Sequence, residues 1–399
     1  MRSTIVGMDE LARARAAAKI GLAHITESHE AKAGGIPVVV DQLARQTARA
    51  GLGVEILSVG RNPMDPPSGV KLTNVPPGRI GAFWGWSRDL KRKVYSIAQG
   101  RNPRLFHIHG VWLASHWYGA QVARKTGMPF ILSAHGQLEP YHWRDKGVLQ
   151  LAKKELYWHA VAYPAFRWAS VIHAITRLEG DHLAQLFPDQ RIEIIPNAVD
   201  LDEVDKGLSG APLSRRSGRT STVAFLGRFH PKKGLDLLIE AFVAAQLPAE
   251  WSLVLAGPSG EPAYMSLLRD IIARSGVEER IRFIGPLTNS SKWEFYQSAT
   301  VVAVPSLSEA VGMVNLEAAA CGTPTITTYE TGLDDWEGSG GGMLIRPNVR
   351  ELASALQKVC SLSARDYEAR STASRRLVED RYSWPVVLEK WLRLYDSLL

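Results

Sequence analysis

Two carboxylates, Glu309 and Glu317, have seven residues between them in the stretch PSLSEAVGMVNLEAAACGTPTITT. The apolar run Ala299–Val304 comes first and predicts a buried parallel strand. A helix of small residues is expected to begin at Gly312 or Met313, because a loop comes before it and apolar residues follow. Glu309 would then lie in the loop before the helix, and Glu317 on its second turn.

The space between these carboxylates suits a phosphate group. The first helical turn, Gly312–Val314, is expected to offer free backbone N–H groups at the positive end of the helix dipole. Carboxylates on either side could accept hydrogen bonds from sugar hydroxyls. Gly322 ends the helix and Pro324 starts the next strand. The stretch therefore predicts a pocket for a sugar, a diphosphate and a ribose.

A cationic loop in the same half of the chain suits the same ligand. The predicted strand Thr222–Leu226 is followed by GRFHPKKG and then by a helix from Leu235. Arg228 and the lysines of this loop can neutralise a diphosphate, because cations beside a strand–helix loop lie near the helix N-terminus.

Together these motifs carry a family resemblance. Glu309-x7-Glu317 followed by Cys321-Gly322-Thr323-Pro324 resembles the signature of retaining glycosyltransferases of the GT-B fold, family 4. The usual sequence of this family at the first carboxylate is Glu-Gly-Phe-Gly, whereas this chain has Glu309-Ala310-Val311-Gly312.

The resemblance implies a role for each motif residue. Glu309 would contact donor-sugar hydroxyls, and Glu317 the ribose. Arg228 and Lys233 would grip the donor phosphates, with Lys232 as a neighbouring solvated charge. Backbone groups of Gly285-Pro286-Leu287 would contact the nucleotide base.

Further candidates lie in the first half of the chain. Gly34 and Gly35 precede a helix predicted from Pro37 to Ala50, where glycines allow close approach to a phosphate. A tight strand–helix loop explains them as well, and the family's similar loop favours the phosphate. His135 follows the predicted strand Phe130–Ala134, and open α/β sheets bind ligands at such strand ends. The resemblance implies that His135 holds the donor sugar or stabilises charge at the reaction centre.

Other patterns are interpreted as structural. His107 and His109 share one strand face at spacing two, but without a nearby Asp, Glu or Cys we expect structural histidines and no metal site. Asp200-Leu201-Asp202 has the D-x-D form of another glycosyltransferase fold, and its position favours helix capping. Trp84 and Trp86 precede a basic helix and are explained by core packing, by acceptor contact or by a membrane interface.

Alternating strands and helices predict an α/β protein with two parallel sheets. The resemblance implies two Rossmann-like domains facing across a cleft, with a C-terminal helix crossing back to the first. The expected organisation is an N-terminal extension (1–20), an acceptor-side domain (21–206), a linker (207–220), a donor-nucleotide-binding domain (221–380) and the crossing helix (381–399).

Composition limits the class of protein. The chain has 399 residues, of which 45% are hydrophobic, which is enough for two globular domains. Its two cysteines, Cys321 and Cys360, cannot form a disulfide framework, and no secretory signal or membrane span is visible, so a cytoplasmic protein is expected. The net charge of +7 has two interpretations. It is a basic surface without a role, or it attracts anionic lipid or a phosphate-bearing substrate. The sequence contains no basic-aromatic module of the kind that binds nucleic acid.

The sequence thus predicts a metal-independent glycosyltransferase without a cofactor. It would move a sugar from a nucleotide-diphosphate sugar to a hydroxyl of a glycan or lipid-linked acceptor, as in polysaccharide or glycolipid biosynthesis. The resemblance implies retention of configuration, with the departing phosphate taking the acceptor proton. The alternatives are a nucleotide-sugar epimerase of the same fold, a two-lobed sugar-binding protein and a degenerate nucleotide-sugar-binding scaffold. The sugar, the base, the acceptor, the linkage and the oligomeric state do not follow from the sequence.

Overall fold

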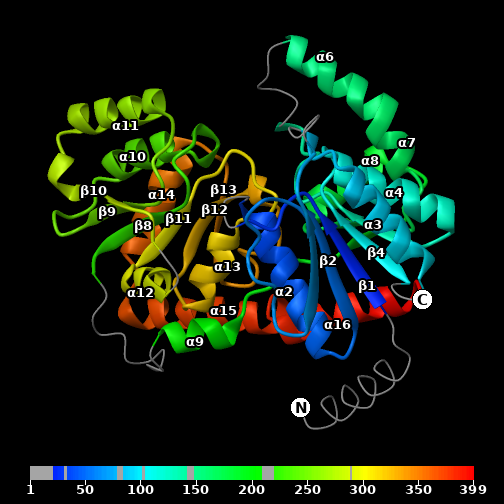
Figure 1. Ribbon diagram of the computed structural model, residues 1–399. Helices are drawn as coiled ribbons and strands as arrows, with labels where there is room; N and C mark the ends of the chain where they lie inside the picture. Colours follow the sequence, from blue (N-terminus) through cyan, green and yellow to red (C-terminus); the bar gives the residue numbers. More distant parts are fainter. Residues whose placement is uncertain are drawn as a thin grey trace, which may run out of the picture. The chain divides into compact units, whose positions relative to one another are not determined.

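The computed structural model describes residues 21–30, 34–78, 84–100, 104–141, 148–208, 220–287 and 290–399 (Figure 1). The predicted extension 1–20 and most of the predicted linker, 209–219, lie outside these residues. Contacts within the chain divide it into two compact units. The first comprises the described residues up to Pro196 together with Leu388–Leu399, and the second comprises Asn197–Val387.

The first unit contains a seven-stranded parallel sheet in the order β3-β2-β1-β4-β5-β6-β7. Its strand order reverses between β1 and β4, so the loops after these strands leave the carboxyl edge in opposite directions. The strands are β1 (Gly21–Thr26), β2 (Gly53–Val59), β3 (Val70–Val75), β4 (Leu105–His109), β5 (Phe130–Ser133), β6 (Val171–Ala174) and β7 (Ile192–Ile194).

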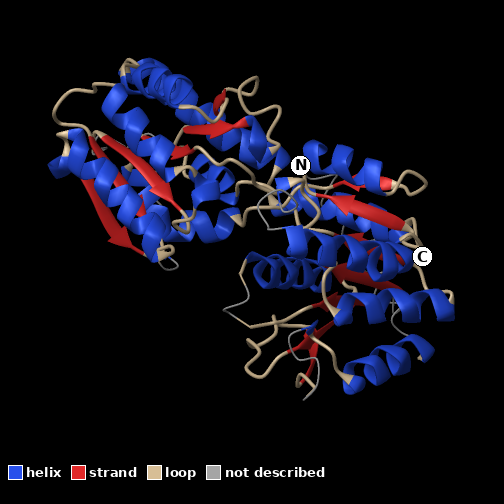
Figure 2. Ribbon diagram, turned by 90° about the horizontal axis from the view of Figure 1, so that it is seen from above, coloured by secondary structure: helices blue, strands red, loops and turns tan. Residues whose placement is uncertain are grey.

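Helices connect these strands, as expected of a parallel sheet. Figure 2 shows the strands in red among the surrounding helices in blue. The helices of this part are α2 (Gly35–Arg49), α3 (Arg88–Gln99), α4 (Ala114–Thr126), α6 (Val148–Tyr157), the π-helix η3 (Trp158–Ala162), α7 (Tyr163–Phe166) and α8 (Arg177–Leu186).

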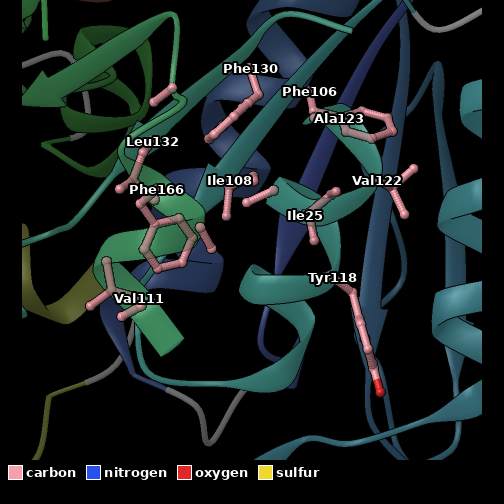
Figure 3. Close-up of a cluster of buried hydrophobic side chains, with 14 of the residues drawn as sticks. Ile25, Phe106, Ile108, Val111, Tyr118, Val122, Ala123, Phe130, Leu132 and Phe166 are labelled. Atoms are coloured by element: carbon pink, nitrogen blue, oxygen red, sulfur yellow. The ribbon is translucent and has the colours of Figure 1, made fainter. Parts of the chain in front are cut away.

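The two faces of the first sheet differ in chemistry. Phe106 and Ile108 of β4 point into an apolar cluster that includes Tyr118 and Val122 of α4 (Figure 3). The alternate residues of the same strand, His107 and His109, lie on the opposite face because side chains alternate along a strand. The core therefore packs on one face, and buried polar side chains occupy part of the other.

The C-terminal helix α16 (Trp384–Asp396) covers this histidine-bearing face. The Trp391 ring lies 4.9 Å from the ring of His107 and 4.5 Å from that of His173, centroid to centroid. The Tyr395 hydroxyl bonds to His107 Nδ1 at 3.1 Å. The predicted return of the C-terminal helix to the first domain is confirmed by these contacts.

The second unit contains a six-stranded parallel sheet in the order β10-β9-β8-β11-β12-β13. Here the order reverses between β8 and β11. The strands are β8 (Thr222–Leu226), β9 (Ser252–Ala256), β10 (Ile281–Gly285), β11 (Val301–Val304), β12 (Thr325–Thr328) and β13 (Gly342–Ile345).

Its helices follow the alternation that the sequence predicts. They are α9 (Leu201–Gly207), the 3₁₀-helix η5 (Pro231–Lys233), α10 (Leu235–Ala244), α11 (Pro262–Ser275), the 3₁₀-helix η6 (Glu278–Arg280), α12 (Ser290–Ser298), α13 (Met313–Ala320), the 3₁₀-helix η7 (Tyr329–Thr331), α14 (Val349–Cys360) and α15 (Ala364–Arg381). No helix among the described residues is long and apolar enough to cross a membrane.

Three local details differ from the sequence-based expectation. Helix α2 begins at Gly35, so Pro37 is its third residue and not its first. The helical region between residues 148 and 166 widens into the π-helix η3 before Pro164, which has no amide hydrogen for a regular i→i−4 bond. Helix α9 groups with the second unit, whereas the sequence placed residues 201–206 in the first domain.

Candidate active site

The loops after β8 and β11 leave the carboxyl edge of the second sheet where its strand order reverses. In open α/β sheets this is the position where ligands bind. Arg228 and Lys233 lie in the loop after β8, and Glu309 lies in the loop after β11. The residues predicted to bind the phosphate and the sugar therefore follow two adjacent strands of the sheet.

The backbones of these two loops are in direct contact. Gly234 has φ +66°, and a Cβ atom at this position would lie 2.3 Å from the Pro305 carbonyl oxygen. Two residues away in each loop, the Leu307 amide donates to the Lys232 carbonyl at 2.7 Å. Only glycine fits at residue 234, because both the conformation and the space exclude a side chain.

This loop contact brings Lys233 and Glu309 together. The Lys233 ammonium donates to Glu309 Oε1, and the Ser306 hydroxyl donates to the same oxygen at 3.1 Å. The two side chains are 19% and 11% exposed, so the pair is partly shielded from water and remains reachable by a ligand. The structure thus joins two residues that the sequence assigned to different parts of one donor.

The cations around this pair act on one another. Lys232 is half-buried, which corrects the expectation of a solvated charge. Burial lowers the pKa of Lys232, and the nearby cations Lys233 and Arg228 lower it further, while Glu309 opposes them. Arg228 itself is exposed. The concentration of positive charge in this loop favours binding of an anion.

Helix α13 begins beside Glu309 as predicted, with Gly312 as its N-cap. The Met313 amide donates to the Val311 carbonyl at 2.9 Å, and the Asn315 amide donates to the Gly312 carbonyl at 2.8 Å. The sequence-based picture of an N-terminus with free amides is therefore too simple, since part of its donors are used locally. Gly312, Met313 and Val314 still line the start of the helix.

Glu317, on the second turn of α13, has two partners from α12. Lys292 Nζ donates to Glu317 Oε1 at 2.9 Å, and the Tyr296 hydroxyl donates to Oε2 at 2.8 Å. Tyr296 is fully buried; burial and the adjacent Glu317 carboxylate raise its pKa well above the usual value. The phenol is thus a fixed hydrogen-bond donor that orients Glu317.

His135 lies in the first unit, just after β5. Its Nε2 atom lies 2.9 Å from Nδ1 of His109, and the two rings stack at 5.2 Å. His109 Nε2 lies 2.9 Å from Nδ1 of His24. Burial lowers the pKa of His135 to about 3, so a neutral imidazole is expected at neutral pH. This hydrogen bond leaves Nδ1 of His135 for a ligand.

The strand histidines have the partners expected of structural residues. His107 contacts Tyr395 through Nδ1 and Ser133 through Nε2, the latter at 2.7 Å. Nitrogens of His24, His107 and His109 lie within 4.8 Å of one another, which is close enough for a metal ion. Hydrogen bonds within the cluster account for this proximity at His24 and His109.

Two glycines of the first unit stay as predicted candidates. Gly34 has φ +88° and caps α2, and Gly35 is its first residue. Both are exposed, and a Cβ atom added to either would meet nothing within 4 Å. Packing therefore does not require glycine at Gly35.

Two alternative patterns are placed by their contacts. The Asp200 carboxylate accepts from the Glu203 amide at 3.1 Å at the start of α9, which confirms helix capping for the D-x-D sequence. The Trp84 indole donates to the Trp112 carbonyl at 3.0 Å and packs against the first core. Trp86 lies 5.6 Å from the Arg88 guanidinium, ring centroid to carbon.

Several site residues escaped the sequence analysis. No local motif marks Lys292, Tyr296 or Ser306 as a ligand-binding residue. Lys292 and Tyr296 lie 25 and 21 residues from Glu317 in the chain, so only the folded sheet brings them to that carboxylate. Ser306 lies 3 residues from Glu309. Ser306, three residues before Glu309, was the one neighbour that spacing could have suggested.

Comparison with known families covers most of the chain. The model of Glycosyltransferase Family 4 matches residues 33–203, and that of Glycosyl transferases group 1 matches residues 214–376. A D-inositol 3-phosphate glycosyltransferase of Mycobacterium sp. (strain JLS) is 31% identical over 325 residues, which cover 75% of this chain and 71% of that protein. The enzyme of the same name from Mycobacteroides abscessus is 28% identical over 381 residues, with 83% and 82% covered.

Solved structures share the fold at lower identity. Sucrose-phosphate synthase from Thermosynechococcus elongatus superimposes with a TM-score of 0.74 at 20% identity, covering 95% of this chain and 99% of that one. Anabaena HepE in complex with UDP and glucose gives a TM-score of 0.71 at 18% identity, covering 95% and 100%. These likenesses support the GT-B architecture of two parallel α/β sheets.

Proposed function

Because this chain belongs to the group 1, family 4 glycosyltransferases of GT-B fold, we propose that it transfers a sugar from a nucleoside diphosphate sugar to an acceptor hydroxyl, with retention of configuration. The observation that carries the proposal is the Lys233–Glu309 ion pair at the strand-order reversal of the second sheet. It joins a phosphate-binding cation to an acceptor of sugar hydroxyl hydrogens in one place.

The ion pair suggests how the donor enters. Without a ligand, Lys233 and Glu309 neutralise each other in a partly buried position. A diphosphate gives Lys233 a stronger anionic partner, which releases Glu309 to accept hydrogen bonds from the sugar hydroxyls. Arg228 and the start of α13 add positive potential for the same phosphates.

Glu317 is proposed to bind the ribose. Its carboxylate is 18% exposed, and Lys292 and Tyr296 hold both of its oxygens in place. Each oxygen has more than one lone pair, so the anchored carboxylate can still accept hydrogen bonds from ribose hydroxyls.

Departure of the nucleoside diphosphate is the step these cations favour. The bond between the anomeric carbon and the phosphate oxygen breaks, and negative charge develops on that oxygen next to Lys233 and Arg228. We infer that the leaving phosphate takes the proton of the acceptor hydroxyl as the new glycosidic bond forms on the same face. His135, held neutral, would donate or accept hydrogen bonds at the sugar rather than act as the base. The proposed chemistry needs no metal.

The acceptor class is less narrowly defined. Two relatives are named D-inositol 3-phosphate glycosyltransferase, so a phosphorylated polyol is the first acceptor to test. Glycan and lipid-linked acceptors, as in polysaccharide or glycolipid synthesis, follow. The net charge of +7 favours an anionic acceptor or an anionic membrane surface nearby. Two cysteines are too few for a disulfide framework, which favours a reducing compartment such as the cytoplasm.

Nucleotide binding tests the donor site directly. Thermal unfolding and calorimetry are carried out with UDP, GDP and ADP on the wild type, Lys233→Ala and Glu317→Ala. A ligand at a hundred times its Kd should stabilise the protein by about 2.7 kcal/mol. One nucleotide should stabilise the wild type and lose most of its effect in both variants. Lys358→Ala, at an exposed lysine of α14, is the matched control and should bind normally.

Absence of binding by any nucleotide at millimolar concentration, or equal binding by Lys233→Ala and the wild type, would contradict the proposed site. The epimerase alternative is distinguished by its product. An epimerase would release a sugar with one inverted centre and form no glycoside when an acceptor is present.

A further inference from the structure

The backbone at His135 is strained. His135 has φ +53° and the following Gly136 has φ +73°, so two consecutive residues are in the left-handed region. A residue with a Cβ atom rarely adopts this conformation, which costs on the order of 1 kcal/mol and persists only where the surroundings enforce it. Something next to this loop must therefore hold it.

A buried carboxylate provides that restraint. Glu179 is 2% exposed, and its Oε1 accepts from the Gly136 amide at 2.7 Å. Its other oxygen, Oε2, accepts from the Ile175 amide at 2.7 Å. One side chain thus fastens the loop after β5 to the loop after β6 through two short hydrogen bonds.

This use of Glu179 departs from ordinary helix capping. Thr176 caps α8 by accepting from the Glu179 amide at 3.2 Å, which is half of a capping box. In a complete box the glutamate would bond back to the amide of the cap residue itself. Here the carboxylate reaches the residue before the cap and the neighbouring loop instead.

The imidazole of His135 is restrained separately. His109 holds its Nε2 atom at 2.9 Å, and His24 holds His109 in turn. With Glu179 fixing the backbone and His109 fixing the ring, the side chain has one orientation. His24 and His109 lie on the face of the sheet opposite the hydrophobic core.

We propose that Glu179 is a positioning residue that holds His135 in its left-handed conformation for the transfer reaction. This inference rests on the proposed function, because His135 matters to the chemistry only if the chain transfers a sugar. Glu179 itself contacts no donor atom in this scheme. It acts through Gly136 and therefore only through His135.

A double-mutant cycle tests this dependence. Glu179→Gln keeps the shape but places an N–H group against one of the two backbone N–H donors, so one bond is lost. We expect kcat to fall roughly 10- to 100-fold, the cost of a small misplacement at a reacting centre. In the His135→Ala background the same substitution should change kcat by less than about twofold, since the residue it positions is already absent.

Nucleotide affinity separates positioning from damage to the fold. The dissociation constant of the preferred nucleoside diphosphate should stay within about twofold of the wild-type value in Glu179→Gln, because that ligand is held by the second unit. Asp181→Asn, an exposed carboxylate on the same helix, removes the same charge and should leave kcat unchanged. Equal losses from Glu179→Gln with and without His135 would overturn the inference.

An NMR measurement that does not depend on activity tests the positioning role of Glu179 even if the proposed function is wrong. The imidazole resonances of His135, assigned with His135→Ala, should shift in Glu179→Gln and stay in place in Asp181→Asn. Unmoved resonances in Glu179→Gln would overturn the positioning role even in an inactive protein. An active wild type that loses activity in His135→Ala but not in Glu179→Gln would overturn only this inference, whereas lack of any transfer by the wild type would overturn the proposed function.

Discussion

Each carboxylate of the candidate site has fixed partners. Glu309 is held by Lys233 and Ser306, and Glu317 by Lys292 and Tyr296. Such anchoring reduces the entropy lost when a ligand binds. The proposed donor site is in this sense organised before the donor binds.

Tyr296→Phe should weaken nucleotide binding without affecting the phosphate part of the site. Loss of the buried hydroxyl removes one bond to Glu317, worth about 1–1.5 kcal/mol and hence about tenfold in Kd. Calorimetry with the preferred nucleoside diphosphate and with pyrophosphate should show this loss only for the nucleoside compound. A similar loss for pyrophosphate would contradict the assignment of Glu317 to the ribose.

The contribution of Glu179 to stability should depend on pH. Burial raises the pKa of its carboxyl to about 7, and Glu139 adds to the rise, while the amides of Ile175 and Gly136 oppose it. Glu139 itself pairs with His182 Nδ1 at 2.8 Å, and the neutral His135 precedes Gly136, whose amide donates to Glu179. Because the folded pKa exceeds the unfolded one, the folded state binds more protons between about pH 4.5 and 7.

The contribution of Glu179 is therefore complete below pH 4.5 and declines as the pH rises through 7. Urea unfolding of the wild type and Glu179→Gln at pH 5, 6, 7 and 8 measures the difference in the free energy of unfolding. That difference should shrink steadily with rising pH, and growth of the difference would contradict the raised pKa.

Residues in local motifs could be predicted from the sequence, and the others could not. Glu309, Glu317 and the cationic loop have a recognisable spacing along the chain. Glu179 also has a local sign, since Thr176-x-x-Glu179 has the form of a capping box, yet nothing local says that its carboxylate bonds to Gly136, 43 residues earlier. Such partners are chosen by the neighbouring strands of the sheet.

At the scale of elements, the site depends on how closely two loops approach. The turn after η5 contacts the Pro305 carbonyl, and this contact brings Lys233 to Glu309. The strand and helix positions that create this approach follow from apolar runs and their end signals. The sequence placed β8 correctly and α13 to within a residue, because both have sharp boundaries.

Gly234→Ala should disrupt both stability and nucleotide binding. The added Cβ atom would lie 2.3 Å from the Pro305 carbonyl oxygen, so one loop must move. Gly276→Ala is a matched control, since its φ of +71° is similar but a Cβ atom there meets nothing within 4 Å. Both variants should lose about 1 kcal/mol from the left-handed conformation.

Only Gly234→Ala should lose more than this and also bind the nucleotide more weakly, as measured by urea unfolding and calorimetry. Equal effects of the two variants would show that the approach of the loops is unimportant.

Neither the π-helix η3 nor the first residue of α2 is predicted by the residue types that signal helix ends. The π-helix η3 lies before Pro164, and its first residue, the buried Trp158, packs on Phe187 with ring centroids 5.6 Å apart. The hydrophobic period of a helix does not contain such details.

At the scale of the whole molecule, the histidines of the first unit link its stability to pH. Six histidines with lowered pKa values lie on or near its sheet: the buried His24, His107, His109, His116 and His173, and the half-buried His135. Burial lowers the pKa of His24 to about 3 and that of His173 to about 4. The unfolded chain, with pKa values near 6.5, therefore binds more protons below that pH.

Stability from these histidines is complete above pH 6.5 and lost as the pH falls towards 3–4. This loss should exceed the opposing effect of the single Glu179. Hydrogen exchange of β4 and β5 at pH 8, 6 and 5 should show faster opening at lower pH. His159→Gln, at a histidine that is 72% exposed, should leave the trend unchanged. Slower opening at pH 5 than at pH 8 would contradict this account.

The organisation into two parallel sheets followed from alternating patterns and a family resemblance. The boundary between the two units did not follow from the sequence, because the contacts of α9 decide to which unit this helix belongs. Acceptor identity also stays a proposal, since no local pattern of the first half defines it.

The measurement that tests the central claim most directly is the product of a single reaction followed by proton NMR. A nucleotide sugar with the preferred base, chosen for its α-configured anomeric centre, is incubated with the protein and a panel of phosphorylated polyols and glycans. We predict an α-linked glycoside and free nucleoside diphosphate from the first turnover, with both lost in Lys233→Ala. A β-linked product, or a changed sugar without a glycoside, would contradict the account.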